Sequence, residues 1–238
     1  QIDISIIITA YRCDKYLEQS IQSVLSQSIS NIEVIIVDDA SPDHCGEIAE
    51  RYAAKDNRVL CIHNIKNKGV AESRNIGVSI AKGKWIAFLD GDDLWVPDKL
   101  KRQLEVLQDN SYSLCYTGAY FFYDDNLKRT KKINIPSSIG YKRLCFGNVI
   151  ITSSVLVARD IVNKFPMERS DLHEDYITWL KILKSYGTAI GINEPLTLHR
   201  VLVDSKSGRK LKSAITTWRT YRYMGWSFMK CFCCFAAY

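Results

Sequence analysis

The sequence lacks any run of about 18 consecutive apolar residues, the length that a helix needs to cross a bilayer. Its first strand-like run, Ile4 to Ile8, is too short for a secretory signal peptide. We therefore expect a cytoplasmic protein. With 47% hydrophobic residues among 238, the chain can build the core of one large or two small domains.

A paired cysteine framework is also missing. The eight cysteines are scattered, several of them in apolar runs, without the spacing of a disulfide scaffold. We expect reduced and mostly buried thiols. The cluster of Cys231, Cys233 and Cys234 lies among phenylalanines with no histidine nearby, which favours packing or lipid contact over zinc binding.

No acidic residue occurs from position 206 to 238, where seven basic residues gather. The rest of the chain holds 25 basic and 26 acidic residues, a net charge of −1. This nearly neutral body argues against nucleic acid as a partner, because a nucleic-acid-binding domain carries its basic patch on the body. The basic, aromatic tail indicates contact with an anionic surface at one end only.

The same tail predicts an amphipathic helix. Its apolar positions fall within about a third of the helical circumference, and basic residues border them. Aromatic and basic side chains together suit the anionic inner face of the plasma membrane, where the protein would bind peripherally. The apolar face could equally pack on the body. The apolar positions are Leu211, Ala214, Ile215, Trp218 and Tyr221.

Two glycine-rich motifs are absent after the first predicted strand. A dinucleotide-binding oxidoreductase would need a Gly-x-Gly-x-x-Gly turn there, whereas residues 10–14 read Ala-Tyr-Arg-Cys-Asp. A nucleotidyltransferase that makes sugar nucleotides would need a glycine-rich, basic loop at the same place. Both enzyme classes are disfavoured.

The first hundred residues alternate strand and helix patterns with short loops. Strict alternation implies parallel pairing with right-handed crossovers, so we expect an α/β fold with a Rossmann-like, mostly parallel twisted sheet flanked by helices. Strands are predicted at 4–9, 33–37, 59–62 and 85–89, and helices around 17–25, 45–55 and 70–81.

The alternation of strand and helix patterns ends after the helix that contains Leu100, and the next half is predicted to be mixed α+β. We expect three regions, 1–110, 111–205 and 206–238, the first two packed as one body. The predicted elements of the second are a strand at 112–123, a charged turn at 124–132, a strand at 150–157, a helix from Glu174 and a short strand at 189–192.

An acidic turn, Asp90-Gly91-Asp92-Asp93, directly follows the strand that ends at Leu89. Three carboxylates within four residues repel one another unless a cation or ordered solvent compensates their charge. Mg²⁺ and Mn²⁺ prefer carboxylate oxygens and keep positions open for substrate phosphates. The alternative is a turn that only caps the following helix.

Gly69 and Arg74 strengthen the metal interpretation. Gly69 permits a tight turn into a helix N-terminus, and Arg74 offers a fork of donors suited to phosphate. Alone, Arg74 could be a solvated surface residue. Together with the acidic turn, it predicts a site for a metal ion and a diphosphate.

These segments, in this order, resemble glycosyltransferase family 2, which has the GT-A fold. The matching stretches are 5–11, 26–28, 37–43, 69–77 and 90–93, and 173–180 looks like the family's acceptor-side Glu-Asp element. The stretch from Trp218 to Arg222 is most similar to bacterial enzymes of teichuronic acid, capsule and O-antigen assembly.

The resemblance implies roles on the donor side. Thr9, Ala10 and Tyr11 would hold the uracil, and Asp39 would accept a hydrogen bond from its ring N–H, which suits UDP-sugars. Asp90 would face the ribose or the water shell of the metal. Asp92 would bind Mn²⁺ or Mg²⁺ directly.

On the acceptor side, the resemblance implies that Asp175 is the general base. One carboxylate near the acceptor hydroxyl is enough for a single inverting displacement. Glu174 would belong to the acceptor side too. The alternative for both residues is capping of the helix N-terminus. Trp179, one helical turn later, could stack on an acceptor sugar or pack in the core.

His199 and Arg200 depart from the pattern, because the family more often has a tyrosine before the arginine. We consider His199 a candidate contact of the metal or diphosphate and Arg200 a candidate phosphate contact.

The resemblance thus implies a metal-dependent, inverting hexosyltransferase that moves a sugar from UDP to a hydroxyl of a lipid-linked glycan in bacterial surface polysaccharide biosynthesis. The alternative is a non-catalytic UDP-sugar-binding scaffold module of a glycan-assembly complex.

Overall fold

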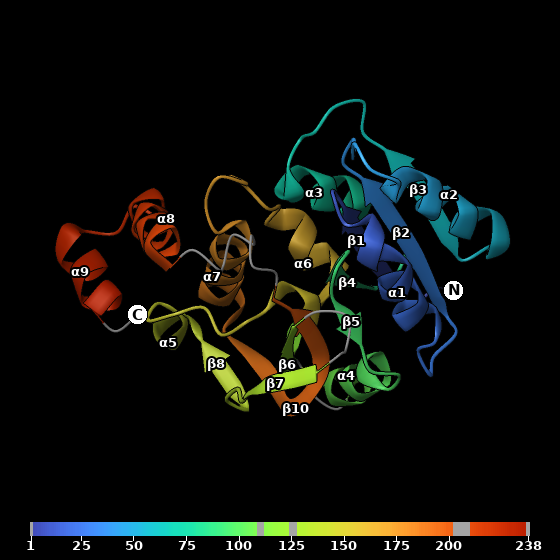
Figure 1. Ribbon diagram of the computed structural model, residues 1–238. Helices are drawn as coiled ribbons and strands as arrows, with labels where there is room; N and C mark the ends of the chain where they lie inside the picture. Colours follow the sequence, from blue (N-terminus) through green and yellow to red (C-terminus); the bar gives the residue numbers. More distant parts are fainter. Residues whose placement is uncertain (1, 109–111, 124–127, 202–209, 237–238) are drawn as a thin grey trace.

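The computed structural model describes residues 2–108, 112–123, 128–201 and 210–236. Its first half is a parallel sheet, as predicted, and the strand order is β3-β2-β1-β4. Figure 1 shows this sheet with the helices that connect its strands. The strands are β1 (Ile4–Ala10), β2 (Ile32–Asp38), β3 (Val59–His63) and β4 (Trp85–Asp90), and the helices are α1 (Asp14–Leu25), α2 (Cys45–Lys55) and α3 (Val70–Ile80).

Apolar residues on both faces of the strands explain why this sheet is covered on both sides. Ile6 and Ile8 of β1 belong to one buried cluster with Leu17 of α1, whereas Ile7 belongs to a second cluster with Val78 of α3. Successive residues of a strand point to opposite faces, so a continuous run of isoleucines buries both. The two clusters form the core.

The second half continues the same sheet. The strand β9 (Leu156–Ala158) lies antiparallel between β4 and β6 (Leu114–Tyr123), and β6 runs parallel to β10 (Thr188–Arg200). The sheet therefore passes without a break from one half to the other. The remaining strands are β5 (Leu94–Trp95), β7 (Lys128–Ile133) and β8 (Ser138–Gly140).

Several elements of this half differ from the predictions. The strand expected at 150–157 is confirmed only at its end, where β9 begins at Leu156. Before it, Thr152–Ser154 forms a 3₁₀ turn, η1, because hydroxyl side chains there bond locally and across to the acidic turn. The charged turn expected at 124–132 is wrong from Lys128 on, where β7 pairs with β6; residues 124–127 lie outside the described residues. The strand expected at 189–192 extends to Arg200, across register shifts around Pro195.

Helices flank the second half. They are α4 (Lys99–Gln108), α5 (Tyr141–Leu144), α6 (Arg159–Lys164) and α7 (Glu174–Tyr186). The face of α7 that carries Tyr176 and Leu180 is buried in the same cluster as Phe88 of β4. That packing fixes the first turn of α7 relative to the end of β4.

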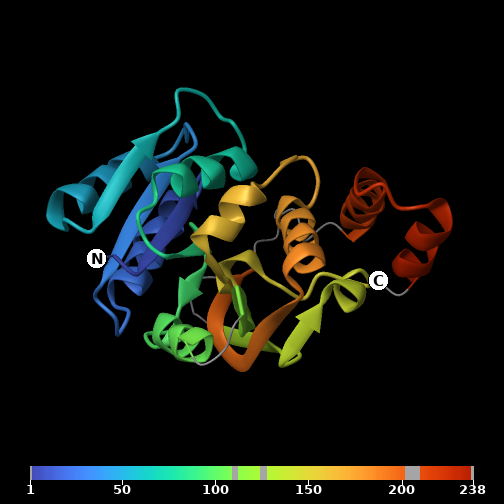
Figure 2. The same ribbon diagram turned by 180° about the vertical axis from the view of Figure 1, so that it is seen from behind.

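The tail forms two helices, α8 (Lys210–Tyr223) and α9 (Phe228–Ala236), which pack on the body. Tyr221, Trp226, Cys231 and Cys234 are buried in the cluster that contains Tyr176. The packing alternative for α8 is therefore realised through Tyr221, while Ile215 of the predicted stripe is 56% exposed. Figures 1 and 2 show both helices at the end of the molecule opposite α2 and β3.

None of the helices that the structure describes combines the length and the apolar character needed to span a bilayer.

Candidate active site

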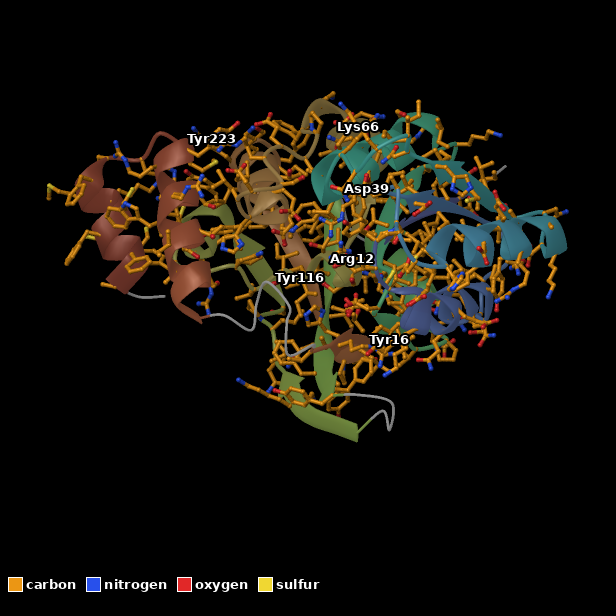
Figure 3. All side chains as sticks on the ribbon, turned by 45° about the horizontal axis from the view of Figure 1, so that its top comes forward. Arg12, Tyr16, Asp39, Lys66, Tyr116 and Tyr223 are labelled. Carbon is orange, nitrogen blue, oxygen red and sulfur yellow. The ribbon has the colours of Figure 1, made fainter. Side chains whose placement is uncertain are left out.

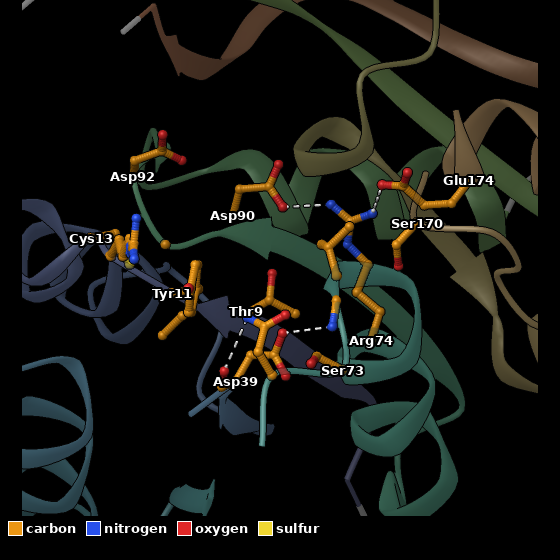
Figure 4. A pocket seen from close by; sticks show the side chains of 16 residues that line it. Thr9, Tyr11, Cys13, Asp39, Ser73, Arg74, Asp90, Asp92, Ser170 and Glu174 are labelled. Atoms are coloured by element: carbon orange, nitrogen blue, oxygen red, sulfur yellow. Dashed lines mark hydrogen bonds and ion pairs between the residues drawn. The ribbon is translucent and has the colours of Figure 1, made fainter. Parts of the chain in front are cut away.

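A cavity of about 510 Å³ opens at the carboxyl ends of β1, β2 and β4. Open α/β sheets bind ligands at this edge. Most of the residues expected to bind the donor line the cavity (Figure 4), and Figure 3 places Asp39 and Arg12 of its wall near the middle of the molecule. They are Thr9, Ala10, Tyr11, Asp39, Arg74, Asp90 and Asp92.

The turns that follow β1 and β2 have strained backbones that are tied together. Arg12 and Ala40 have φ values of 53° and 54°, in the left-handed region that costs a non-glycine residue about 1 kcal/mol. The amide of Arg12 donates to Ser41 Oγ at 2.7 Å. Such strain gathers at binding sites, where the surrounding structure maintains it.

Asp39 is buried and anchors the loop before α3. Its Oδ1 accepts hydrogen bonds from Asn64 Nδ2 at 2.7 Å and the Lys68 amide at 2.8 Å, and its Oδ2 accepts one from the Gly69 amide at 2.8 Å. A carboxylate oxygen has two lone pairs. Within the described residues, Oδ2 therefore keeps one acceptor position for a ligand N–H.

The three carboxylates of the acidic turn point in different directions. Asp93 is fully buried and turned inward, where it accepts bonds from Ser153 Oγ at 2.6 Å and the Arg200 amide at 2.9 Å. Asp90 pairs with Arg74, and Asp92 faces the cavity (Figure 4). Gly91 allows this turn, because a Cβ there would lie 2.7 Å from Cys13 Sγ and 2.9 Å from the carbonyl of Thr9.

The surroundings of Asp92 are strongly negative. Burial, together with the charges of Asp93 and Asp90, raises the pKa of Asp92 to about 7. A bound cation would reverse this shift by stabilising the ionised carboxylate. The turn therefore offers one carboxylate for which a cation is the natural partner.

The described residues contain no group of three or more His, Cys, Asp and Glu side chains arranged to hold a metal by themselves. Mg²⁺ commonly binds through one or two carboxylates and takes its other ligands from water and substrate phosphates. Asp92, with Asp90 next to it in the cavity wall, fits this donor set for Mg²⁺ or Mn²⁺.

His199 is bonded to the acidic turn. Its Nδ1 donates to Asp93 Oδ2 at 2.9 Å. Burial alone would lower the pKa of His199, but the charges of Asp93, Asp90 and Asp92 raise it to about 9. His199 therefore places positive charge under the acidic turn, and its contact with a metal or diphosphate stays a prediction.

Arg74 joins the two sides of the site. Its Nη2 donates to Asp90 Oδ1 at 2.6 Å and its Nη1 to Glu174 Oε1 at 3.0 Å, and the side chain is 4% exposed. The guanidinium that was expected to bind phosphate is thus paired with two carboxylates, as its burial requires, and its contact with a phosphate stays a prediction. Arg74 lines the cavity and also locks α7 to the acidic turn.

A second cavity of about 660 Å³ adjoins the first and holds Asp175. The two cavities share Arg74, Asp90, Ser170 and Glu174 in their walls. One wall of the second cavity comes from α8, through Ser213, Thr216 and Arg219. A ligand in each cavity would meet the other at Asp90 and Arg74.

Asp175 is held by three hydrogen bonds. Its Oδ2 accepts from Thr152 Oγ1 at 2.9 Å and from Asn148 Nδ2 at 3.3 Å, and its Oδ1 accepts from the amide of Tyr176 at 2.7 Å. The side chain is half-buried and lines the second cavity. An oriented carboxylate in this position can accept a proton from a hydroxyl bound beside it.

Trp179 and Arg200 do not line either cavity. Trp179 is fully buried, with its ring 6.3 Å from that of Phe88, so acceptor stacking is wrong and core packing explains it. Arg200 is 2% exposed, and its Nε donates to the carbonyl of Asp92 at 2.9 Å. It supports the acidic turn from beneath, so the expected phosphate contact is also wrong.

Sequence reasoning missed Thr152, Asn148 and the contribution of α8. Isolated threonine and asparagine residues carry no signal in one sequence, and Thr152 lies in a segment that was predicted as a strand. The basic composition of the tail predicted contact with a membrane, but it did not predict that Thr216 and Arg219 of α8 line the cavity of Asp175.

The comparisons with known proteins agree with this geometry. The family model described as "Glycosyl transferase family 2" matches residues 5–165. TuaG of Bacillus subtilis, named as a teichuronic acid biosynthesis glycosyltransferase, is 35% identical over 236 residues, 99% of this chain and 94% of its own length. WfaP of Escherichia coli, named as a UDP-Glc:alpha-D-GlcNAc-diphosphoundecaprenol beta-1,3-glucosyltransferase, is 36% identical and covers 89% of this chain and 82% of its own.

Solved structures share the fold at low sequence identity. TarS of S. aureus in complex with UDP-GlcNAc superposes with a TM-score of 0.75 at 16% identity and covers 93% of this chain and 66% of its own. The mannosyltransferase PcManGT of Pyrobaculum calidifontis, in complex with GDP-Man and Mn²⁺, gives 0.73 at 16% identity and covers 98% of this chain and 68% of its own.

Proposed function

Because the chain belongs to glycosyl transferase family 2, we propose that it is an inverting enzyme that moves a hexose-type sugar from a UDP-sugar to a hydroxyl of a lipid-linked glycan. The family and the GT-A fold expected from the sequence are both confirmed. The pathway that we propose is bacterial surface polysaccharide biosynthesis, since relatives are named for teichuronic acid biosynthesis and for sugar transfer to a diphosphoundecaprenol carrier.

The observation that carries the proposal is the adjoining position of the two cavities. One holds Asp39 and Asp92, the other holds Asp175, and both contain Asp90 and Arg74. A donor in the first cavity and an acceptor in the second would bring the anomeric carbon next to the acceptor hydroxyl.

Asp175 is the proposed general base. It would take the proton of the acceptor hydroxyl while the hydroxyl oxygen forms a bond to the anomeric carbon and the bond from that carbon to the diphosphate breaks. One displacement from the opposite face inverts the anomeric configuration. Thr152 and Asn148 would keep the carboxylate oriented during this step.

Asp92, with Asp90 beside it, is the proposed holder of the divalent cation. A bound Mn²⁺ or Mg²⁺ would supply charge neutralisation for the departing diphosphate. His199, which bonds to Asp93, and the buried Arg200, which donates to the carbonyl of Asp92, support the acidic turn from beneath. Where the nucleotide base would bind, Asp39 has a remaining lone pair and the ring of Tyr11 is 42% exposed, and both suit a uracil.

The acceptor is proposed to enter the cavity of Asp175, between α7 and α8. A lipid-linked acceptor would require the enzyme to work at the inner face of the plasma membrane. The charge of the tail supports such a location, because residues 206–238 contain seven basic residues and no acidic ones.

The experiment that tests the proposal is release of UDP from UDP-sugars with and without Mn²⁺ and acceptor. Asp175→Asn should lower turnover by about 10²- to 10⁴-fold, the range typical of a lost general base, and leave UDP binding unchanged. Chelation of the metal should abolish turnover in the wild type. Nuclear magnetic resonance of the product should show the inverted anomer.

Asp160→Asn is the matched control, since Asp160 also lies in the first turn of a helix but is exposed and remote from both cavities. It should behave as wild type. UDP binding without turnover in the wild type would support the scaffold alternative. Equal turnover in Asp175→Asn and wild type would remove Asp175 as the base.

A further inference from the structure

The outward face of α9 carries an apolar surface that the described part of the chain leaves uncovered. Phe228, Met229 and Phe232 are 67%, 79% and 64% exposed, whereas Cys231 and Cys234 on the other side of the helix are buried. Phe232 follows Phe228 by four residues and Met229 by three, and residues at these two spacings are neighbours on the surface of a helix. We refer to Phe228, Met229 and Phe232 as the α9 face.

The three large apolar side chains of the α9 face lie close together, whereas the exposed apolar side chains of most protein surfaces are scattered singly. A contiguous exposed patch indicates an interaction site. The helix α9 lies at the extreme end of the molecule in Figures 1 and 2, so a flat partner could reach it without meeting the donor half.

The charges around the α9 face are positive. Lys230 of the same helix lies with its Nζ 3.3 Å from Tyr141 Oη, which places α5 next to α9. Lys142 and Arg143 of α5 are exposed, and Arg222 in the last turn of α8 is exposed as well. Apolar side chains rimmed by Lys and Arg are typical of segments that lie in the interface of an anionic leaflet.

The α9 face is coupled to the acceptor cavity through α8. The ring of Trp218 on α8 packs at 5.4 Å from that of Phe228 and 5.7 Å from that of Phe235. Arg219, the next residue of α8, and Thr216, two residues before Trp218, line the cavity that holds Asp175. A surface bound to α9 would therefore lie beside the entrance for the acceptor.

We propose that the α9 face docks the protein on an anionic membrane leaflet, so that a lipid-linked acceptor reaches the cavity of Asp175 from the bilayer surface. This inference rests on the proposed function for the nature of the acceptor. It also moves the membrane contact from the stripe expected on α8, where Tyr221 is buried, to the exposed side of α9.

The test is co-sedimentation of the full chain with phosphatidylcholine vesicles that contain or lack phosphatidylglycerol. The wild type should bind the anionic vesicles at least tenfold more tightly than the neutral ones. The double variant Met229→Ser/Phe232→Ser should lose at least tenfold in affinity for the anionic vesicles. These two side chains are the most suitable to change because Phe228 also packs on Trp218.

Ile65→Ser is the matched control, since Ile65 is fully exposed on the donor half and distant from α9. It should bind vesicles as the wild type does. Circular dichroism and thermal unfolding of each variant show whether the tail still packs. An environment-sensitive fluorophore on the exposed Cys233 gives a second readout, because its emission should shift to the blue on anionic vesicles alone.

Wild type that ignores anionic vesicles, or a double variant that binds them as well as wild type does, overturns the proposal. A dimer that the double variant dissociates, with vesicle binding unchanged, would assign the α9 face to a second copy of the chain instead. Turnover with a water-soluble acceptor separates failure of the membrane-docking proposal from failure of the proposed glycosyl transfer. The double variant should retain this turnover. If the proposed glycosyl transfer is wrong, the wild type will show no turnover with this acceptor either.

Discussion

Single side chains decide how Asp175 is presented to a substrate. Its Oδ2 is held by Thr152 Oγ1 at 2.9 Å, and Thr152 is itself 6% exposed, so no solvent molecule can easily replace that hydroxyl. Asn148 contributes a longer bond of 3.3 Å from a more exposed position. Thr152 is therefore the main positioning residue of the proposed base.

Thr152→Val should lower kcat by about tenfold, because a hydrogen bond to a charged group is worth roughly 1.5 kcal/mol or more. KM for the UDP-sugar should stay the same, since Thr152 lies in the wall of the acceptor cavity alone. Thr152→Ser keeps the hydroxyl and should restore most of the rate. Steady-state kinetics on the three proteins check this, and equal rates in the Val and Ser variants would contradict it.

At the scale of elements, α2 begins and ends at the predicted residues, Cys45 and Lys55, because its apolar positions and flanking loops are local signals. The strand β10 is three times longer than expected. Its second part pairs with β6 beyond Pro195, and such pairing depends on a partner some 80 residues earlier. Local periodicity cannot report a partner at that distance, nor can it locate η1, which tertiary hydrogen bonds stabilise.

The first residue of α4 is unusual because Lys99 is a fully buried lysine. Its Nζ donates to Gln103 Oε1 at 2.8 Å and lies 3.9 Å from the centre of the Trp95 ring. Burial lowers the pKa of Lys99 to about 7, whereas an exposed lysine in the unfolded chain titrates near 10.4. Between these pH values the unfolded state binds more protons than the folded state, so this group makes stability rise with pH.

Lys99→Met should remove that dependence and raise the free energy of unfolding at pH 7 by roughly 2 kcal/mol or more, since it replaces a buried amine with an apolar chain of similar length. The gain should persist below pH 7 and shrink toward pH 10. Urea unfolding of both proteins at pH 6.5, 8 and 9.5 measures this difference. A constant difference in unfolding free energy across the pH series would show that the pKa of Lys99 is not lowered in the folded protein.

At the scale of the whole molecule, the sequence predicted which residues gather at the donor cavity but not how they pair. Thr9, Tyr11, Asp39 and Asp92 lie at or just after strand ends, and strand ends meet at one edge of a parallel sheet, so their position could be predicted. The partners of Arg74 could not. They depend on where α7 docks against β4, which is set by packing between segments about 100 residues apart.

Arg74 therefore connects two halves that the sequence presents as separate motifs. It is the cation between Asp90 at the end of β4 and Glu174 at the start of α7, and all three line both cavities. Burial by itself would lower the pKa of Arg74, but the charges of Asp90 and Glu174 raise it above its usual value. The guanidinium stays charged, and both carboxylates depend on it.

Arg74→Met should destabilise the fold by about 3 kcal/mol, because removal of one partner leaves buried charges without compensation. The second change in Arg74→Met/Glu174→Gln removes one of those charges and should recover part of the loss. Arg169→Met is the control: it breaks an exposed pair with Asp171, which should cost at most about 1 kcal/mol. Urea unfolding compares the variants, and calorimetry with UDP and Mn²⁺ reports the donor cavity. A loss in Arg74→Met no larger than that in Arg169→Met would show that the two halves are held together by the apolar packing of α7 alone.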